Sequence, residues 1–260
     1  MMSDFLGTIR RLKEGEIAAR RAGTPLNELR ARIRDLPPAR DFEEALRRPG
    51  LSLVAEIKRS SPSAGAIAGE IDPARLGRLY QEGGAAAVSV LTENYYFGGS
   101  LEDLRITKEA VTIPVLRKDF ILDEYQVYES RCAGADAVLL IAEMLDREQL
   151  KKFLRVAGEL GLSCLVESHG RGELKKTIDC PASIIGINNR DLNTLEVDLE
   201  TSLRLLPLIP EDRVRVAESG IRTAGDVRRL AGAGADAILV GETLVRSDNV
   251  KATIKELINM

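Results

Sequence analysis

The stretch SLVAEIKRSSPSAG, residues 52–65, begins as a buried strand and ends in two opposite charges, Glu56 and Lys58. Residues i and i+2 of a strand point to the same side, so the carboxylate and the ammonium share one face. Charges held away from water are costly, and they are usually functional. The spacing therefore predicts an acid–base site at the end of this strand.

Further polar residues follow other apolar runs. Lys118 ends LRK, Glu167 follows SCLV, and Asn188 and Arg190 follow IIGI. If these runs are parallel strands of one barrel, their carboxyl ends meet at one mouth, which is where the active sites of such barrels lie. We predict that these side chains converge there with Glu56 and Lys58.

Two glycine-containing turns come after the last two apolar runs, ESG at 218–220 and VGE at 240–242. Phosphate recognition needs backbone N–H groups near the start of a helix, and glycine lets a backbone approach closely. The ends of strands seven and eight are where barrels of this class hold phosphate. Ser219, Gly220 and Gly241 are therefore candidates for a phosphate site, and Glu242 can contribute only its N–H.

The elements that position these residues follow from an internal repeat. Three similar segments, GGAAAVSVL, AGADAVLLI and AGADAILVG, carry Gly84, Gly134 and Gly234 at intervals of 50 and 100 residues. The unit of about 25 residues has the length of one strand plus one helix. The predicted strands are 51–57, 86–91, 113–117, 136–141, 162–166, 183–187, 213–217 and 236–240.

Most of these strands are continuous apolar runs, as expected for strands covered on both faces. Amphipathic helices such as 146–160 and 223–234 separate them. We predict an α/β fold, a (β/α)8 TIM barrel over 51–260, with an open doubly wound sheet as the alternative. Residues 1–50 add an N-terminal helical extension with helices over 5–21, 26–36 and 41–48, which packs as a lid or shields a strand edge. We expect one domain over 1–260.

Composition excludes several classes of function. The net charge of −3 creates no global attraction for nucleic acid or an acidic membrane. The three cysteines, Cys132, Cys164 and Cys180, form no C-x-x-C pair, so we expect neither disulfides nor a metal site. The N-terminus lacks an apolar signal core, and no apolar run is long enough to span a membrane. We expect a cytoplasmic monomer.

The combination of VAEIKRSSPSAG, LRKDFILDEYQ, GADAVLLIAEML, LVESH, IGINNRDLNTLEVD and VAESGI resembles the indole-3-glycerol-phosphate synthase family over nearly the whole chain. The resemblance implies a decarboxylating carbon–carbon lyase of tryptophan biosynthesis. Its substrate is a sugar phosphate, 1-(2-carboxyphenylamino)-1-deoxyribulose 5-phosphate, which it converts to indole-3-glycerol phosphate with loss of CO2 and water. It implies no metal and no organic cofactor.

The resemblance also implies a role for each matching residue. Lys118 is the general acid for ring closure, and Glu167 is the general base for the dehydration. Lys58 pairs with the substrate carboxylate, and Glu56 stabilises positive charge near the anilino nitrogen. Further residues orient the substrate or bind its phosphate: Asn188 and Arg190 hold hydroxyls and carboxylates, and Ser61, Ser219, Gly220 and Gly241 bind the phosphate.

The aromatic half of such a substrate requires an apolar wall. Strand ends supply five candidates for this wall: Phe97, Phe120, Leu139, Ile141 and Leu192. Some relatives place a tryptophan of the N-terminal segment against the substrate ring. This chain has no tryptophan, which leaves Phe5 as the available aromatic residue. We interpret His169 as structural or peripheral, and the cysteines as packing residues.

Three other functions remain open on the sequence. A different phosphate-binding barrel, such as phosphoribosylanthranilate isomerase or a tryptophan synthase α-type lyase, does not explain GINNRDL together with two strand-end lysines. A Schiff-base aldolase would use Lys58 or Lys118 as nucleophile, and borohydride would then trap a covalent adduct. A non-catalytic sugar-phosphate binder has no need of the acid–base set.

Overall fold

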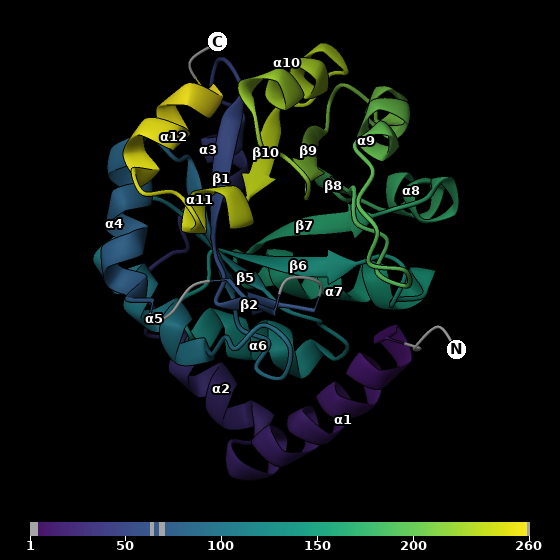
Figure 1. The fold of residues 1–260 in the computed structure, drawn as a ribbon. Coiled ribbons are helices and arrows are strands. Elements are labelled where there is room, and N and C mark those ends of the chain that lie inside the picture. The colour runs from purple at the N-terminus through teal and green to yellow at the C-terminus, as the bar shows by residue number, and fades with distance from the viewer. Residues whose placement is uncertain (1–4, 63–64, 68–70, 259–260) are drawn as a thin grey trace.

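Within the residues that the structure describes, 5–62, 65–67 and 71–258, eight parallel strands close into a barrel (Figure 1). The structure is a computed structural model. The order around the barrel is β1-β10-β9-β8-β7-β6-β5-β4, so strands consecutive along the chain are neighbours. The strands are β1 (Ser52–Ile57), β4 (Ala87–Leu91), β5 (Val115–Lys118), β6 (Ala137–Ile141), β7 (Ser163–Ser168), β8 (Ile184–Asn188), β9 (Val214–Glu218) and β10 (Ala237–Val240). The predicted barrel is confirmed, with strand boundaries that differ by one or two residues.

Helices cover the outside of the barrel, and each strand of the barrel is followed along the chain by one of them (Figure 1). Side chains cap several of them: Asp123 and Asp146 form capping boxes with the glutamines at the third helical position. The helices around the barrel are α4 (Pro73–Gly83), α5 (Leu101–Ala110), α6 (Glu124–Cys132), α7 (Arg147–Glu159), α8 (Arg171–Ile178), α9 (Glu200–Leu205), α10 (Ala224–Gly232) and α12 (Val250–Ile258).

The alternation of strand side chains produces two separate apolar clusters. Leu53, Val138 and Val166 point outward and pack with the helices. Val54 and Leu165 point inward and fill the barrel below its mouth. Both sides of each strand are therefore buried, which explains why the strands read as continuous apolar runs.

The N-terminal helices are α1 (Phe5–Gly23), α2 (Leu26–Ile33) and α3 (Phe42–Leu46). Phe42 and Leu46 of α3 are fully buried against the inner cluster, at the end of the barrel opposite the mouth. The helices α1 and α2 lie against α6 on the outside (Figure 1), and Phe5 at the start of α1 reaches the mouth. The extension thus contributes to both ends of the barrel.

Buried charges fasten α1 to the barrel. Lys13 is 1% exposed, and its Nζ lies 2.7 Å from Asp119 Oδ1, directly after β5. Arg20 Nη1 lies 3.0 Å from Glu129 Oε2 of α6. These pairs hold the helix that carries Phe5 beside the strand that carries Lys118.

Three short elements, β2, β3 and α11, were not predicted. Ser60–Ser61 (β2) and Gly65–Ala66 (β3) form a two-stranded antiparallel sheet after β1, and Glu242–Val245 form a single helical turn, α11, after β10. Elements of two to four residues show no hydrophobic period that a sequence pattern can detect. None of the helices in the described ranges is long and apolar enough to cross a membrane.

Candidate active site

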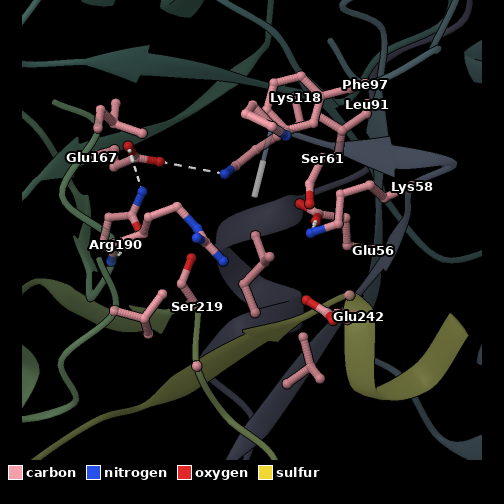
Figure 2. Close-up of a pocket in the computed structure, with 18 of the residues that line it drawn as sticks. Glu56, Lys58, Ser61, Leu91, Phe97, Lys118, Glu167, Arg190, Ser219 and Glu242 are labelled. Carbon is pink, nitrogen blue, oxygen red and sulfur yellow. Dashed lines mark hydrogen bonds and ion pairs between the residues drawn. The ribbon is translucent and has the colours of Figure 1, made fainter. Parts of the chain in front are cut away.

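A cavity of about 460 Å³ opens at the carboxyl ends of the barrel strands (Figure 2). Every residue that the sequence predicted for catalysis or substrate binding lines it. These residues are Glu56, Lys58, Ser61, Phe97, Lys118, Phe120, Leu139, Ile141, Glu167, Asn188, Arg190, Leu192, Ser219, Gly220, Gly241 and Glu242.

Lys118, the last residue of β5, lies between two carboxylates. Its Nζ is 3.3 Å from Glu167 Oε2 and 3.0 Å from Glu218 Oε2. Burial acts to lower the pKa of Lys118, but the negative charges of Glu218 and Glu167 outweigh it and raise that pKa above the ordinary lysine value. The side chain is therefore an ammonium at neutral pH.

Glu218 was not among the predicted site residues. It ends β9, is 1% exposed, and has no hydrogen-bond partner for either carboxylate oxygen among the described residues apart from its ion pair with Lys118. Burial raises the pKa of Glu218 to about 7, opposed by Lys118 and reinforced by Glu167 and Glu56. Glu218 comes directly after the predicted seventh strand and lies on the inner face with Val214 and Val216, but the ESG stretch was interpreted only as a phosphate-binding turn.

Glu167 is oriented by Asn188. The Asn188 Nδ2 donates to Glu167 Oε1 at 3.0 Å, and Asn188 Oδ1 accepts from the Arg190 backbone N–H at 2.9 Å. Figure 2 shows Glu167 directed at Lys118. A carboxylate with one oxygen on an amide and the other near an ammonium keeps a defined orientation, as a general base requires.

Glu56 and Lys58 share one face of the strand end, as predicted, with Lys58 Nζ 3.2 Å from Glu56 Oε1 (Figure 2). Gly241 of the adjacent strand end makes room for this carboxylate. A Cβ at position 241 would lie 2.6 Å from Glu56 Oε1. This glycine therefore admits the Glu56 side chain in addition to lining the predicted phosphate site.

The turn after β9 has an unusual backbone. Ser219 has a φ of 68° although it is not a glycine, and Gly220 has a φ of 79°. A Cβ at Gly220 would lie 2.5 Å from Val197 Cγ1 in the loop that follows β8. Left-handed backbone at a non-glycine residue costs free energy and is concentrated at ligand sites. The turn is held by Asn189, whose Nδ2 donates to Ser219 O at 3.0 Å.

Arg190 is half-buried above Asn188. Its Nη1 donates to the Leu195 carbonyl at 2.8 Å, which joins the two sides of the loop between β8 and α9. Burial lowers the pKa of Arg190, while Glu242 and Glu56 act in the opposite direction. Figure 2 shows the guanidinium directed into the cavity between Glu167 and Ser219.

An aromatic cluster lines another part of the cavity. The Phe120 ring centroid lies 6.4 Å from that of Phe97 and 6.3 Å from that of Phe5. Glu93 is fully buried and accepts backbone N–H bonds from 95, 96 and 97 at 2.8–3.1 Å, which fixes the loop that carries Phe97. Phe5, the candidate for the missing tryptophan, therefore does lie at the cavity wall.

Several other predictions can be compared with the structure. Glu242 Oε1 lies 3.0 Å from Arg246 Nε, and both residues line the cavity, so the Glu242 side chain does not turn away from the site (Figure 2). His169 does not line the cavity, and its Nδ1 is bonded to the Asn188 carbonyl at 2.8 Å. The cavity also contains residues that the sequence did not single out: Leu91, Leu195, Val197, Ile221, Arg222, Thr243 and Arg246.

The described residues contain no group of three His, Cys, Asp or Glu side chains that could hold a metal ion. Cys164 and Cys180 are buried and unpaired, and burial raises the pKa of Cys164 to about 12.

Comparison with known proteins gives one consistent family. The family model described as "Indole-3-glycerol phosphate synthase" matches residues 6–257. A protein of that name from Mycobacterium avium is 47% identical over 94% of this chain and 89% of its own length. One from Kineococcus radiotolerans is 46% identical over 99% and 94%.

Similar solved structures are more distant in sequence. A 3-hexulose-6-phosphate synthase from Salmonella typhimurium superposes with a TM-score of 0.64 at 15% identity, covering 80% of this chain and 96% of the other. A thiamine phosphate pyrophosphorylase from Pyrococcus furiosus superposes with a TM-score of 0.61 at 18% identity, covering 84% and 96%. At these identities, the likeness shows the barrel fold alone.

Proposed function

The chain belongs to the indole-3-glycerol phosphate synthase family, and we propose that the residues of its barrel mouth divide that family's reaction among them. The reaction closes the ring of 1-(2-carboxyphenylamino)-1-deoxyribulose 5-phosphate and forms indole-3-glycerol phosphate, CO2 and water. The observation that carries the proposal is the ammonium of Lys118 between Glu167 and Glu218, inside a cavity with an aromatic wall.

Lys118 acts in the first step. The ring carbon that bears the carboxylate attacks the ribulose carbonyl, a carbon–carbon bond forms, and the carbonyl π electrons move to oxygen. Lys118 stabilises that oxygen and gives it a proton, because a developing alkoxide is basic enough to take one even from a lysine of raised pKa. Glu218, whose Oε2 lies 3.0 Å from Lys118 Nζ, helps to hold the ammonium in place.

Loss of CO2 and water completes the reaction. The bond to the carboxylate breaks, and its electron pair restores the aromatic ring. Glu167 then acts as the general base: it takes a proton from the methylene carbon next to the carbon that bears the new hydroxyl, and the C–H electron pair forms the ring double bond. The C–O bond breaks at the same time, and an ammonium of the mouth gives the leaving hydroxyl a proton, so that it departs as water. Asn188 supports this role because its amide holds one oxygen of Glu167, so the other remains available at the cavity.

Lys58 and Glu56 bind the anthranilate part of the substrate. Lys58 pairs with the substrate carboxylate until that group leaves as CO2. Glu56, 3.2 Å from Lys58 Nζ, stabilises positive charge at the anilino nitrogen and orients the lysine. Arg190 holds substrate hydroxyls, and the cluster of Phe97 and Phe120 contacts the aromatic ring.

The phosphate binds across the turns after β9 and β10. Ser219 and Gly220 supply the strained turn, Gly241 and Glu242 supply backbone at the start of α11, and Ser61 approaches from β2. Arg222 and Arg246 also line this cavity and add positive charge. A dianionic phosphate is thus met by both backbone N–H groups and cations.

Incubation with the carboxyphenylamino deoxyribulose phosphate tests the function directly. Indole fluorescence that grows with time, with one CO2 released per indole, is the expected result. Borohydride added during turnover separates this scheme from a Schiff-base aldolase, because only the aldolase leaves a lysine adduct. The absence of indole formation would show that the reaction assigned here is wrong.

We also propose that the chain forms one domain and works as a cytoplasmic monomer. In this proposal the reaction uses no metal and no organic cofactor. The exposed large apolar residues of the described chain, Tyr95, Val197 and Leu208, are few, and this supports a monomer. Its unpaired cysteines suit a reducing compartment. Light scattering at working concentration, with and without substrate, measures the oligomeric state.

A further inference from the structure

Gly186 lies in the middle of β8, where a glycine is unexpected. Its φ is not in the left-handed region, so its backbone conformation does not require glycine. Glycine within a strand weakens it and often marks a close approach by another group. The register sets Gly186 beside Glu167 of β7 and Val216 of β9, on the inner face of the barrel.

The group that approaches Gly186 is the carboxylate of Glu218. A Cβ built at position 186 would lie 2.2 Å from Glu218 Oε1 and 3.2 Å from Leu165 Cδ1. Two non-bonded heavy atoms do not pack at 2.2 Å, so an alanine here requires Glu218 to move. The neighbouring wall of the barrel leaves the carboxylate little room, since Glu218 is 1% exposed.

The position of Glu218 is tied to that of Lys118. Glu218 Oε2 lies 3.0 Å from Lys118 Nζ, while Glu167 Oε2 contacts the same Nζ at 3.3 Å. Gly186 is the register partner of Glu167 and the steric neighbour of Glu218. It therefore adjoins both residues, and a side chain there would displace Glu218, whose other oxygen contacts the ammonium.

We propose that Gly186 is a positioning residue for the reaction: its missing side chain provides the space in which Glu218 sits against Lys118. This inference rests on the proposed function for its effect on turnover, but not for its effect on packing. Gly186 is not among the residues that line the cavity, and a side chain there would meet Glu218 first, so it acts through Glu218. The strand stability lost to a central glycine is the cost of admitting a buried carboxylate.

Gly186→Ala in the full chain tests the proposal, with Gly158→Ala as the matched control. Gly158 lies in α7, and a Cβ there meets nothing within 4 Å. We expect Gly186→Ala to lower kcat by about 10-fold or more, since displacements of about 1 Å in catalytic groups have effects of this size. KM should change less than about 3-fold, because the substrate contacts remain. An unchanged kcat would overturn the proposal.

A second variant separates displacement of Glu218 from general damage. Glu218→Asp shortens the side chain and withdraws it from position 186. If Gly186 acts through Glu218, the double variant Gly186→Ala/Glu218→Asp loses less kcat than the product of the two single losses. Losses that simply multiply would mean that the two positions are independent and would contradict the proposal.

Thermal unfolding tests the packing without any assay of activity. Overpacking by one methyl group should lower Tm by about 5 °C in the Gly186→Ala variant. In a Glu218→Ala background the clash is gone, so the same substitution should cost much less. An equal loss of Tm in both backgrounds would overturn the steric basis. If the unmodified chain forms no indole, the proposed function is wrong. The Tm values in the two backgrounds would still show whether Gly186 makes room for Glu218.

Discussion

Arg117 and Lys118 are neighbours on β5, yet they face opposite sides of the barrel wall, and their surroundings differ. Arg117 is buried and Lys118 is partly buried, and each lies within an ion-pair distance of two carboxylates. Arg117, on the outer side, also donates to Thr92 Oγ1 at 3.1 Å and Ser130 Oγ at 3.1 Å. Among the described residues, Lys118 has no such hydroxyl partner, and its ammonium faces the cavity.

The acids around these two cations behave in opposite ways. Burial acts to raise the pKa of Asp119, but Lys13 and Arg117 outweigh it and hold that pKa far below the ordinary range. The pKa of Glu218 is raised instead, because burial and two neighbouring carboxylates outweigh one ammonium. A buried network in which every polar group has a partner favours a fixed structure. A network with unpartnered charged groups can still interact with a ligand. The outer network thus serves stability, and the inner one serves chemistry.

Replacing the inner cation has the largest expected effect. Lys118→Ala should lower kcat by about 10²-fold or more, within the range that a general acid contributes, while the phosphate still binds. Steady-state indole fluorescence measures it, with the exposed Lys151→Ala as control. Unchanged turnover would remove Lys118 from the mechanism.

Replacing the outer cation should affect stability instead. Arg117→Met leaves Asp119 and Glu129 each short of a buried partner, which typically costs about 3–5 kcal/mol of unfolding free energy. Urea unfolding measures the loss, and Arg155→Met, which breaks an exposed pair, should cost less than about 1 kcal/mol. The folded fraction of Arg117→Met should keep its kcat within about 3-fold. If Arg117→Met keeps the unfolding free energy of the parent but loses turnover, the assignment of Arg117 to stability is wrong.

The charges on the inner side of the barrel wall, those of Lys118, Glu167 and Glu218, should make the free energy of unfolding depend on pH. Because Glu218 has a pKa raised from 4.5 to about 7, the folded protein keeps a proton that the unfolded chain releases. The contribution of this carboxyl to the free energy of unfolding is complete below pH 4.5, and it is lost as the pH rises through 7. Glu218→Gln cannot ionise, so relative to the parent it should gain up to about 3 kcal/mol between pH 4.5 and 8.

Unfolding by urea at both pH values, in parent and variant, measures this gain. The groups that face Glu218 and titrate with it are Lys118, Glu167 and Glu56. A difference between variant and parent that is the same at pH 4.5 and 8 would show that Glu218 ionises in the folded state as easily as in water.

The smallest effect is expected at the rim. Arg190→Ala should lower kcat/KM by about 10-fold, because a half-buried guanidinium that holds substrate and loop is lost while the acid–base pair remains. Arg190→Lys, which keeps the charge but not the planar fork, should recover only part of the activity. A variant as active as the parent would demote Arg190 to a surface charge.

Much of the site followed from local pattern. Period-two alternation assigned Glu56 and Lys58 to one face, and the repeat located the strand ends from which Lys118 and Glu167 project. The omission of Glu218 shows the limit of this reasoning. This glutamate comes one residue after a predicted strand, as Lys118, Glu167 and Asn188 do, but the ESG stretch was interpreted only as a phosphate-binding turn. What the carboxylate contacts, Lys118 on β5, depends on a tertiary distance that local pattern does not contain.

The amino-acid sequence by itself determined which residues form strands and helices, which side chains face inward and which family the chain resembles. These properties depend on neighbours within a few residues along the chain. Only the tertiary structure decided that Lys118 meets Glu218 as well as Glu167, that Phe5 reaches the mouth, and that Gly186 leaves room for a carboxylate. These contacts join residues far apart in the sequence, and their distances are set by how the closed barrel staggers its strands.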